Sequence, residues 1–235
     1  MSTIYLVRHG QGSFGTHDYD RLSPLGREQA KLVGEHFAAT GETIDRIYTG
    51  SLRRQRETAE LIAEGLGAKG AALSDAIVEP AFDEYDGTAL LACYASTLSP
   101  DEQTRAGWPA LLADRKRFQL FLEQAARAWV DGKLESESLV SWSGFHGRIV
   151  TALERIMAHE GRGKTLAIAT SGGVIGTAVA HVLGQTTHLG IELNWAVHNG
   201  SLTRLIYTSQ KVSLSMFNAL PHLERMGRPE LITYR

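Results

Sequence analysis

Residues 2–11 read STIYLVRHGQ, an apolar run that ends in polar residues at Arg8 and His9. Such a short apolar run is typical of a buried strand. In open α/β sheets, ligands bind beyond the carboxyl ends of the strands, so this stretch puts His9 where a binding site is expected. A histidine there can act as a nucleophile when a backbone carbonyl holds one ring nitrogen and the other stays free. Arg8 adds a planar set of donors that suits phosphate, and Gly10 lets the backbone approach an anion closely.

The rest of the chain alternates between predicted strands and predicted helices. Ser23 caps a helix that Pro24 begins, and Gly67 ends the next one. We expect further strands over residues 44–49, 76–79, 166–169, 201–207 and 211–217. We expect further helices over residues 52–66, 139–159, 174–183 and 220–223, with a turn at residues 171–173. This alternation favours a three-layer α/β/α sandwich with a mainly parallel central sheet.

Residues 88–140 differ from their surroundings. They are richer in helix-forming residues and contain two of the four tryptophans of the chain. The whole chain has 235 residues, which is about one and a half times the usual length of a domain. We therefore predict a single domain, residues 1–235, into which residues 88–140 are inserted as a helical cap.

Composition and charge exclude several kinds of protein. Hydrophobic residues make up 43% and charged residues 21% of the chain, which is typical of a globular domain. The net charge of −2 gives no basic excess for nucleic acid, and the single cysteine, Cys93, allows no internal disulfide. Residues 165–184 are uncharged and of membrane-spanning length, but the Gly172-Gly173 pair and His181 argue against a span. The first residues do not resemble a signal peptide. We expect a cytoplasmic protein with no membrane or nucleic-acid partner, and a homodimer stays open.

Four segments follow one another in a pattern that is known from a protein family. Residues 6–10 read LVRHG, residues 19–30 read YDRLSPLGREQA, residues 50–59 read GSLRRQRETA and residues 167–175 read AIATSGGVI. In this order they resemble an Arg-His-Gly signature and the motifs L-T/S-x-x-G-x-x-Q-A, S-x-L-x-R-A-x-Q-T-A and V-V-S-H-G-G-V-I. These motifs are those of the histidine phosphatase superfamily, also called the phosphoglycerate-mutase-like family.

The resemblance implies a phosphatase that hydrolyses a small-molecule phosphate monoester without a metal or a cofactor. It implies a phosphohistidine intermediate on His9, from which water releases phosphate. It also makes Arg54 a phosphate ligand beside Arg8, and the start of a predicted helix suits such an anion site. Hydrolysis needs a proton for the leaving oxygen. The resemblance makes Glu84 the candidate for this general acid and for the later base, with Asp83 as the second candidate.

Two positions depart from the family pattern. Ser171 stands where the family has a histidine before Gly-Gly, and its hydroxyl can donate a hydrogen bond to a phosphoryl oxygen but carries no charge. Losing a charge-assisted hydrogen bond in the transition state costs about 1.5–3 kcal/mol, or about ten- to a hundredfold in rate. We expect the backbone N–H of Gly172 to compensate in part, and His198 is a further candidate. The loop after the Arg-His-Gly motif lacks the asparagine of the family, and Gln11 or Ser13 could take its place.

Other functions stay open at this stage. The missing histidine is compatible with a catalytically weak or inactive phospho-ligand-binding protein, and a phosphoglycerate-type mutase is a further alternative. A serine hydrolase with a nucleophile elbow would use Ser171, Glu192 and His222 or His198. A metal site would take its ligands from His9, His17, Asp18 and Asp20.

Overall fold

The computed structural model describes residues 2–13, 20–67, 75–99, 101, 114–208 and 210–234. Residues 85–148 form one compact unit, and the other described residues form a second, larger unit. The larger unit contains the sheet and all the residues that the sequence singles out for catalysis or phosphate binding.

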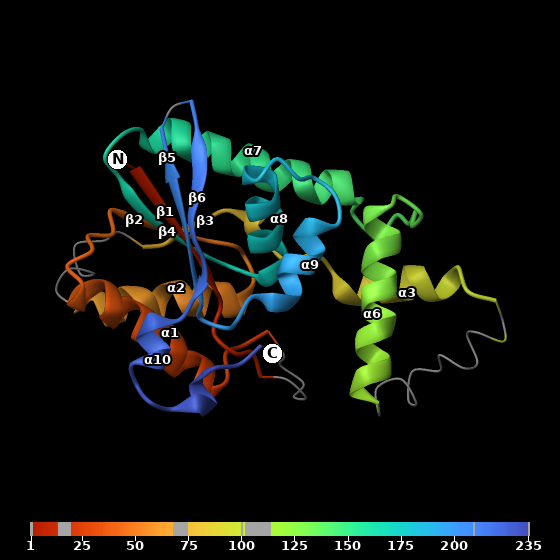
Figure 1. The fold of residues 1–235 in the computed structure, drawn as a ribbon, viewed down its shortest axis with the longest axis horizontal. Coiled ribbons are helices and arrows are strands. Elements are labelled where there is room, and N and C mark those ends of the chain that lie inside the picture. Colours follow the sequence, from red (N-terminus) through yellow and green to blue (C-terminus); the bar gives the residue numbers. More distant parts are fainter. Residues whose placement is uncertain are drawn as a thin grey trace. The chain divides into compact units, whose positions relative to one another are not determined.

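A sheet of six described strands has the order β3-β2-β4-β1-β5-β6 (Figure 1). The strands are β1 (Ser2–Arg8), β2 (Arg46–Thr49), β3 (Ile77–Val78), β4 (Thr165–Thr170), β5 (Leu202–Tyr207) and β6 (Val212–Ala219). The strands β3, β2, β4 and β1 run parallel to one another, β5 runs antiparallel to β1, and β6 runs antiparallel to β5. The connection between β5 and β6 is short, and a short connection allows only antiparallel pairing. The predicted mainly parallel sheet is confirmed.

Helices flank the sheet on both faces (Figure 1). One face carries α1 (Pro24–Ala39) and α2 (Arg53–Leu66), and the other carries α7 (Trp142–Glu160) and α8 (Gly172–Val182). Successive strand residues point to opposite faces, so every second side chain of β1 meets α1 and α2. Val7 accordingly packs in one buried cluster with Phe37 and Ile62. The expected three-layer α/β/α architecture is confirmed for this unit.

Local signals fix the ends of the first two helices. The Ser23 hydroxyl accepts a hydrogen bond from the Gly26 N–H at 3.0 Å, which caps α1, and Pro24 occupies the first helical position. α2 ends at Gly67, whose φ of 60° is unfavourable for residues with a Cβ atom. α1 therefore begins where it was predicted to begin, and α2 begins and ends close to its predicted bounds.

The start of α8 differs from the prediction. Residues 171–173 were expected to form a turn, but Ser171 is the N-cap and the helix begins at Gly172. The glycines of this helix allow close packing against α9 (Leu189–Ala196), a helix that the sequence analysis did not predict. A Cβ atom on Gly176 would lie 2.2 Å from the Gly190 carbonyl oxygen. The glycines thus serve helix packing here, rather than interrupting the helix.

The smaller unit contains α3 (Gly87–Ser96), α6 (Arg115–Val130) and the first turns of α7. Its centre is aromatic: the Trp129 ring lies 5.1 Å from the Tyr85 ring, 5.2 Å from the Trp142 ring and 5.5 Å from the Phe145 ring, measured between centroids. The helical character predicted for residues 88–140 is found in the described part of this region. No helix in the described part of the chain is both long and apolar enough to cross a membrane.

The C-terminal segment lies against α1. It contains α10 (Pro221–Glu224) and a 3₁₀ turn over Pro229–Leu231, labelled η3, whereas another 3₁₀ turn, η2 (Pro80–Phe82), follows β3. Leu223 and Leu231 are fully buried in a cluster with Leu32 of α1. The Gln29 amide of α1 donates to the Leu231 carbonyl at 2.7 Å. This segment is therefore an integral part of the larger unit.

Candidate functional site

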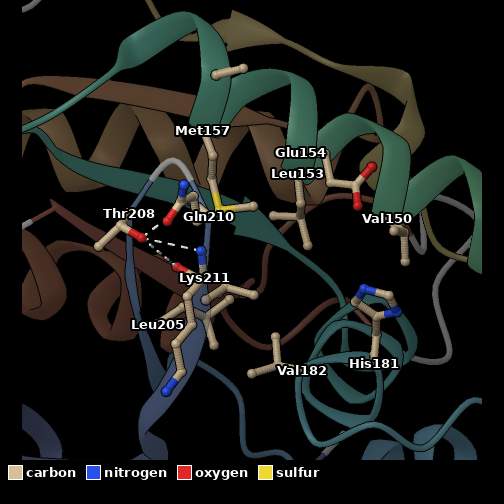
Figure 2. Close-up of a pocket in the computed structure, with 12 residues that line it drawn as sticks. Val150, Leu153, Glu154, Met157, His181, Val182, Leu205, Thr208, Gln210 and Lys211 are labelled. Atoms are coloured by element: carbon tan, nitrogen blue, oxygen red, sulfur yellow. Dashed lines mark hydrogen bonds between the residues drawn. The ribbon is translucent and has the colours of Figure 1, made fainter.

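The structure has a groove that does not lie at the predicted site. A groove of about 520 Å³ lies among α7, α8, β5 and the β5–β6 connection (Figure 2). Its lining is mostly apolar: Val150, Leu153, Met157, Val182, Leu205 and Val212. The groove reaches Thr208, just beyond Tyr207, which pairs with Ser2 at the start of β1. It therefore lies at the opposite end of the sheet from His9, and the histidine and arginine residues of the predicted site do not line it.

His9 directly follows β1 at the carboxyl edge of the sheet. Its backbone N–H donates to the Thr170 carbonyl of β4 at 2.8 Å, which places it beside the start of α8. Next to it, a Cβ atom on Gly10 would lie 2.1 Å from the Gly26 carbonyl oxygen, so only glycine fits between this loop and α1. The His9 backbone is thus held between the sheet and the two helices α1 and α8.

The contacts of the His9 ring determine its tautomer. Nδ1 lies 2.7 Å from the Gly10 carbonyl oxygen, which can only accept, so Nδ1 carries the proton. The Arg54 Nε–H lies 3.1 Å from Nε2 and can only donate, so Nε2 presents its lone pair. Burial of the ring, and then the positive charges of Arg54 and Arg8, lower the pKa of His9 well below 6.5. His9 is therefore a neutral imidazole whose Nε2 carries a lone pair.

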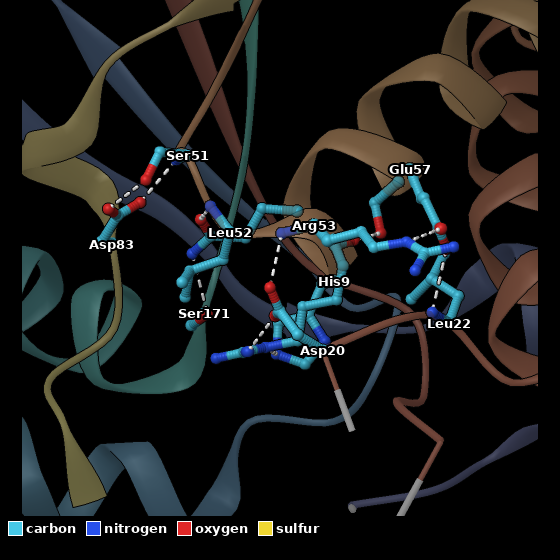
Figure 3. A network of polar contacts seen from close by, with 12 residues as sticks. His9, Asp20, Leu22, Ser51, Leu52, Arg53, Glu57, Asp83 and Ser171 are labelled. Atoms are coloured by element: carbon cyan, nitrogen blue, oxygen red, sulfur yellow. Dashed lines mark hydrogen bonds and ion pairs between the residues drawn. The ribbon is translucent and has the colours of Figure 1, made fainter. Parts of the chain in front are cut away.

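Two arginines supply the positive charge. Arg54 lies in the first turn of α2 with its side chain 11% exposed, and its Nη1 forms an ion pair with the Asp20 carboxylate at 2.5 Å. The Asp20 carboxylate also accepts from the Arg53 N–H at 2.8 Å (Figure 3). Arg8 donates from Nη1 to the Val197 carbonyl. From the sequence, Asp20 was a candidate only as a metal ligand, and its contact with Arg54 was not predicted.

The start of α8 brings Ser171, Gly172 and Glu84 together. The buried Ser171 hydroxyl accepts from the Gln55 side-chain amide at 2.9 Å. The Glu84 carboxylate accepts from the Gly173 N–H at 3.0 Å, so it lies at the positive end of the helix dipole. A Cβ atom on Gly172 would lie 2.4 Å from the Asn194 side-chain oxygen, so this position requires glycine. Since Thr170 at the end of β4 pairs with Arg8 at the end of β1, this helix start and His9 follow adjacent strands.

The other candidates have separate contacts. Asp83 accepts from the backbone N–H and the hydroxyl of Ser51, both at 2.5 Å (Figure 3). The Gln11 side-chain oxygen accepts from the Ser23 hydroxyl at 3.0 Å, and the Ser13 N–H donates to the Arg21 carbonyl at 2.8 Å. The His198 ring lies 4.1 Å from the Tyr234 ring, between centroids, and its Nδ1 contacts Asn218. The contacts of His198 are therefore with the C-terminal part of the chain rather than with the His9 ring.

Two further polar residues support the His9 loop, and neither was predicted from the sequence. The Asn199 amide donates to the His9 carbonyl at 3.2 Å, and its side-chain oxygen accepts from the Thr233 hydroxyl at 3.0 Å. The Gln29 side-chain oxygen accepts from the Gln11 N–H at 2.8 Å. Both are buried, and Gln29 falls at the glutamine of the L-T/S-x-x-G-x-x-Q-A motif. The only signal available for Gln29 was thus its place in that motif.

The alternative sites gain no support from these contacts. No group of three or more histidine, cysteine, aspartate or glutamate side chains suited to a metal ion occurs within the described ranges. His17 and Asp18, two of the ligands considered for a metal, lie outside those ranges. The Ser171 hydroxyl contacts Gln55 and not a histidine, so the triad of a serine hydrolase is not assembled.

The fold is that of an α/β protein, and its candidate site has features that suit an anion. A neutral histidine, an arginine fork and a helix N-terminus meet at the carboxyl edge of its sheet, which suits an anion of the phosphate type. The sequence model of the histidine phosphatase superfamily (branch 1) matches residues 4–114 and 111–220. The chain belongs to this superfamily.

Individual relatives give a consistent picture of the fold. The probable phosphoglycerate mutase GpmB of Cronobacter sakazakii is 28% identical over 216 residues, which cover 88% of this chain and 86% of that protein. The mitochondrial serine/threonine-protein phosphatase PGAM5 of Xenopus laevis is 40% identical over 80 residues, which cover 33% of this chain and 29% of that protein. A mycobacterial glucosyl-3-phosphoglycerate phosphatase in complex with inorganic phosphate superposes with a TM-score of 0.61 at 20% identity, over 94% of this chain and 99% of that one. The chain thus spans less than a third of the length of PGAM5, whereas the solved structure shares its fold almost throughout.

Proposed function

We propose that this protein is a phosphatase that hydrolyses small-molecule phosphate monoesters through a phosphohistidine on His9. The observation that carries the proposal is the state of the His9 ring, which is neutral, has its proton on Nδ1 and presents Nε2 beside Arg54. A ring nitrogen in this state can attack phosphorus without first losing a proton. The names of the relatives support phosphate chemistry, since PGAM5 is a serine/threonine-protein phosphatase and the superposed mycobacterial protein is a glucosyl-3-phosphoglycerate phosphatase.

The first step would transfer the phosphoryl group to His9. In the free site the Nε2 lone pair accepts from Arg54, and a bound phosphoryl group would take over this guanidinium and so release the lone pair. The Nε2–P bond forms as the bond from phosphorus to the leaving oxygen breaks, and the electron pair of that bond leaves with the oxygen. Protonated Glu84 would donate its proton to this oxygen.

The second step would return the enzyme to its starting state. Water forms a new P–O bond as the P–N bond breaks, and the Glu84 carboxylate takes a proton from the water. Arg8, Arg54, the Ser171 hydroxyl and the Gly172 N–H would hold the phosphoryl oxygens through both steps. Metal independence, a cytoplasmic location and the cap role of residues 88–140 stay predictions, as does a homodimer.

The test compares hydrolysis of an aryl phosphate at pH 5 to 8 in EDTA by the wild type, by His9→Ala and by His159→Ala. His159 is exposed near the end of α7 and serves as the matched control. We expect turnover that survives chelation, disappears in His9→Ala and is unchanged in the control. Unchanged activity of His9→Ala would refute the proposal.

A second function follows from one observation, the serine at position 171. Without the charge of a histidine, the site could bind a phosphorylated ligand and turn it over very slowly. Folded wild-type protein that binds phosphate but shows no turnover would favour this phospho-ligand-binding function over hydrolysis.

A further inference from the structure

We propose that Gln55 is a positioning residue that turns the Ser171 hydroxyl proton toward the bound phosphoryl group. In this proposal Gln55 and Ser171 act as a pair in place of the histidine that the family has before Gly-Gly. The inference rests on the proposed phosphate site, and its test separates the two.

The contacts of Gln55 fix the orientation of its side-chain amide. Its Nε2 donates to the Phe82 carbonyl at 3.0 Å and to the Ser171 hydroxyl oxygen at 2.9 Å, and its Oε1 accepts from the Leu52 N–H at 3.3 Å. A carbonyl can only accept and a backbone N–H can only donate. In a flipped amide the oxygen would face the Phe82 carbonyl, and the NH₂ group would face the Leu52 N–H. Neither pair can form a hydrogen bond, so Nε2 must be the atom that faces Phe82 and Ser171.

This orientation determines what the Ser171 hydroxyl can do. Both protons of the Gln55 Nε2 are used, so the Ser171 oxygen is the acceptor and its own proton remains to be donated. Ser171 is fully buried, and no acceptor for that proton occurs among the described residues. Serine at a helix N-cap usually accepts from the first turn of the helix, but the Ser171 side chain makes no such capping bond. A buried donor without a partner is costly, and a bound phosphoryl oxygen would satisfy it.

Gly50 makes room for this arrangement. A Cβ atom on Gly50 would lie 2.0 Å from the Gln55 Oε1, so only glycine leaves space for the amide. Gln55 itself is fully buried. The amide thus occupies a fitted pocket, and its donation to Ser171 does not depend on a mobile surface side chain.

The two members of the pair are both departures from the family motifs. Gln55 stands at the alanine of S-x-L-x-R-A-x-Q-T-A, and Ser171 stands at the histidine of V-V-S-H-G-G-V-I. Gln55 is larger than the alanine of its motif, and Ser171 is smaller than the histidine of its motif. Because the two side chains touch, the exchange keeps the local volume nearly constant.

The first experiment is a double-mutant cycle with Ser171→Ala, Gln55→Met and the double variant. Methionine keeps the length of glutamine but cannot donate. The readouts are the dissociation constant of vanadate and the kcat for an aryl phosphate, with the urea midpoint as a check of folding. We expect Ser171→Ala to weaken vanadate binding by about tenfold and Gln55→Met by about threefold or more. The double variant should match Ser171→Ala within about twofold, because Gln55 acts through Ser171. If the fold-changes of the two single variants multiply in the double variant, the proposal is overturned.

The second experiment restores the family residues. Ser171→His alone would press the larger ring against the buried Gln55 amide and should lower both vanadate affinity and kcat. The double variant Gln55→Ala/Ser171→His should regain at least the wild-type values. If Ser171→His has the same effect with and without Gln55→Ala, the proposal is overturned, even when both variants fold.

The outcomes distinguish this inference from the proposed function. If the wild type binds vanadate without hydrolysing the ester, hydrolysis fails and the binding cycle still decides the role of Gln55. If the wild type hydrolyses the ester and the cycle is additive, only the role of Gln55 fails. If the wild type binds neither vanadate nor phosphate, the inference falls with the site.

Discussion

His222 of α10 makes the folded protein sensitive to acid. Its side chain is fully buried, its ring lies 5.8 Å from that of His36 between centroids, and the charge of Arg225 is near. Burial, and then the neighbouring His36, lowers the pKa of His222 from 6.5 to about 3. Below pH 6.5, His222 therefore binds a proton in the unfolded chain but not in the folded chain. As a result, the free energy of unfolding falls as the pH falls from 6.5 toward 3.

The size of the effect follows from the width of this window. Each pH unit inside it costs about 1.4 kcal/mol of folding free energy for one such histidine. Between pH 6.5 and pH 5.0 the loss from His222 is therefore about 2 kcal/mol. Replacement by leucine, which is apolar and of similar size, removes the titration and should remove this part of the loss.

The assay is urea unfolding at pH 7.5 and pH 5.0 for the wild type, His222→Leu and the control His159→Gln, in which an exposed histidine is replaced. From pH 7.5 to pH 5.0, the free energy of unfolding of the wild type and of the control should fall by about 2 kcal/mol more than that of His222→Leu. Burial also lowers the pKa values of His9 and His36, but these residues contribute in all three proteins. Equal losses in the wild type and in His222→Leu would refute the reasoning.

Three further predictions concern packing and the site. Gly50→Ala should lower the free energy of unfolding by about 1–3 kcal/mol, since its Cβ atom would meet the Gln55 amide at 2.0 Å. Gly147→Ala, in α7 with open space around it, should be neutral or stabilising by up to about 1 kcal/mol, and equal destabilisation by both changes in urea unfolding would contradict this. Glu84→Gln should lower kcat for an alkyl phosphate by about 10²–10⁴-fold and kcat for an aryl phosphate much less, because only the alkyl leaving group needs the proton; equal loss on both substrates would exclude Glu84 as the acid. Gln29→Ala should cost about 1–3 kcal/mol in urea unfolding and speed hydrogen exchange at the Gln11 N–H that Gln29 holds, and unchanged exchange would refute that contact.

Much of the fold could be predicted because its signals are local. β1 spans Ser2–Arg8 as expected, and the Ser23 cap marks the start of α1 in both the sequence and the structure. The helix α9 was missed because it has no side-chain cap and contains Gly190, so its eight residues carry no strong local signal. Its formation depends on packing against α8, which a single sequence does not reveal.

The candidate site likewise has some features with a local sequence signal and others without one. Sequence motifs indicated His9, Arg54 and Ser171, and adjacent strand ends bring their backbones together. The contacts of Asp20 and Gln55 with these residues join positions that are 34 and 116 residues apart, so neither spacing nor periodicity could indicate them. The roles of the predicted site residues in catalysis stay predictions until the variants are measured.

The contacts of the C-terminal segment affect when the site can form during synthesis. Gln29 holds both the Gln11 N–H and the Leu231 carbonyl, which is 202 residues away along the chain. Asn199 likewise joins the His9 carbonyl to the Thr233 hydroxyl. The His9 loop is synthesised before residues 231–233 but completes its hydrogen bonds only after these residues have emerged from the exit tunnel. A nascent chain that stalls before this point would carry every residue of the proposed catalytic machinery and still lack the support that holds His9 in place.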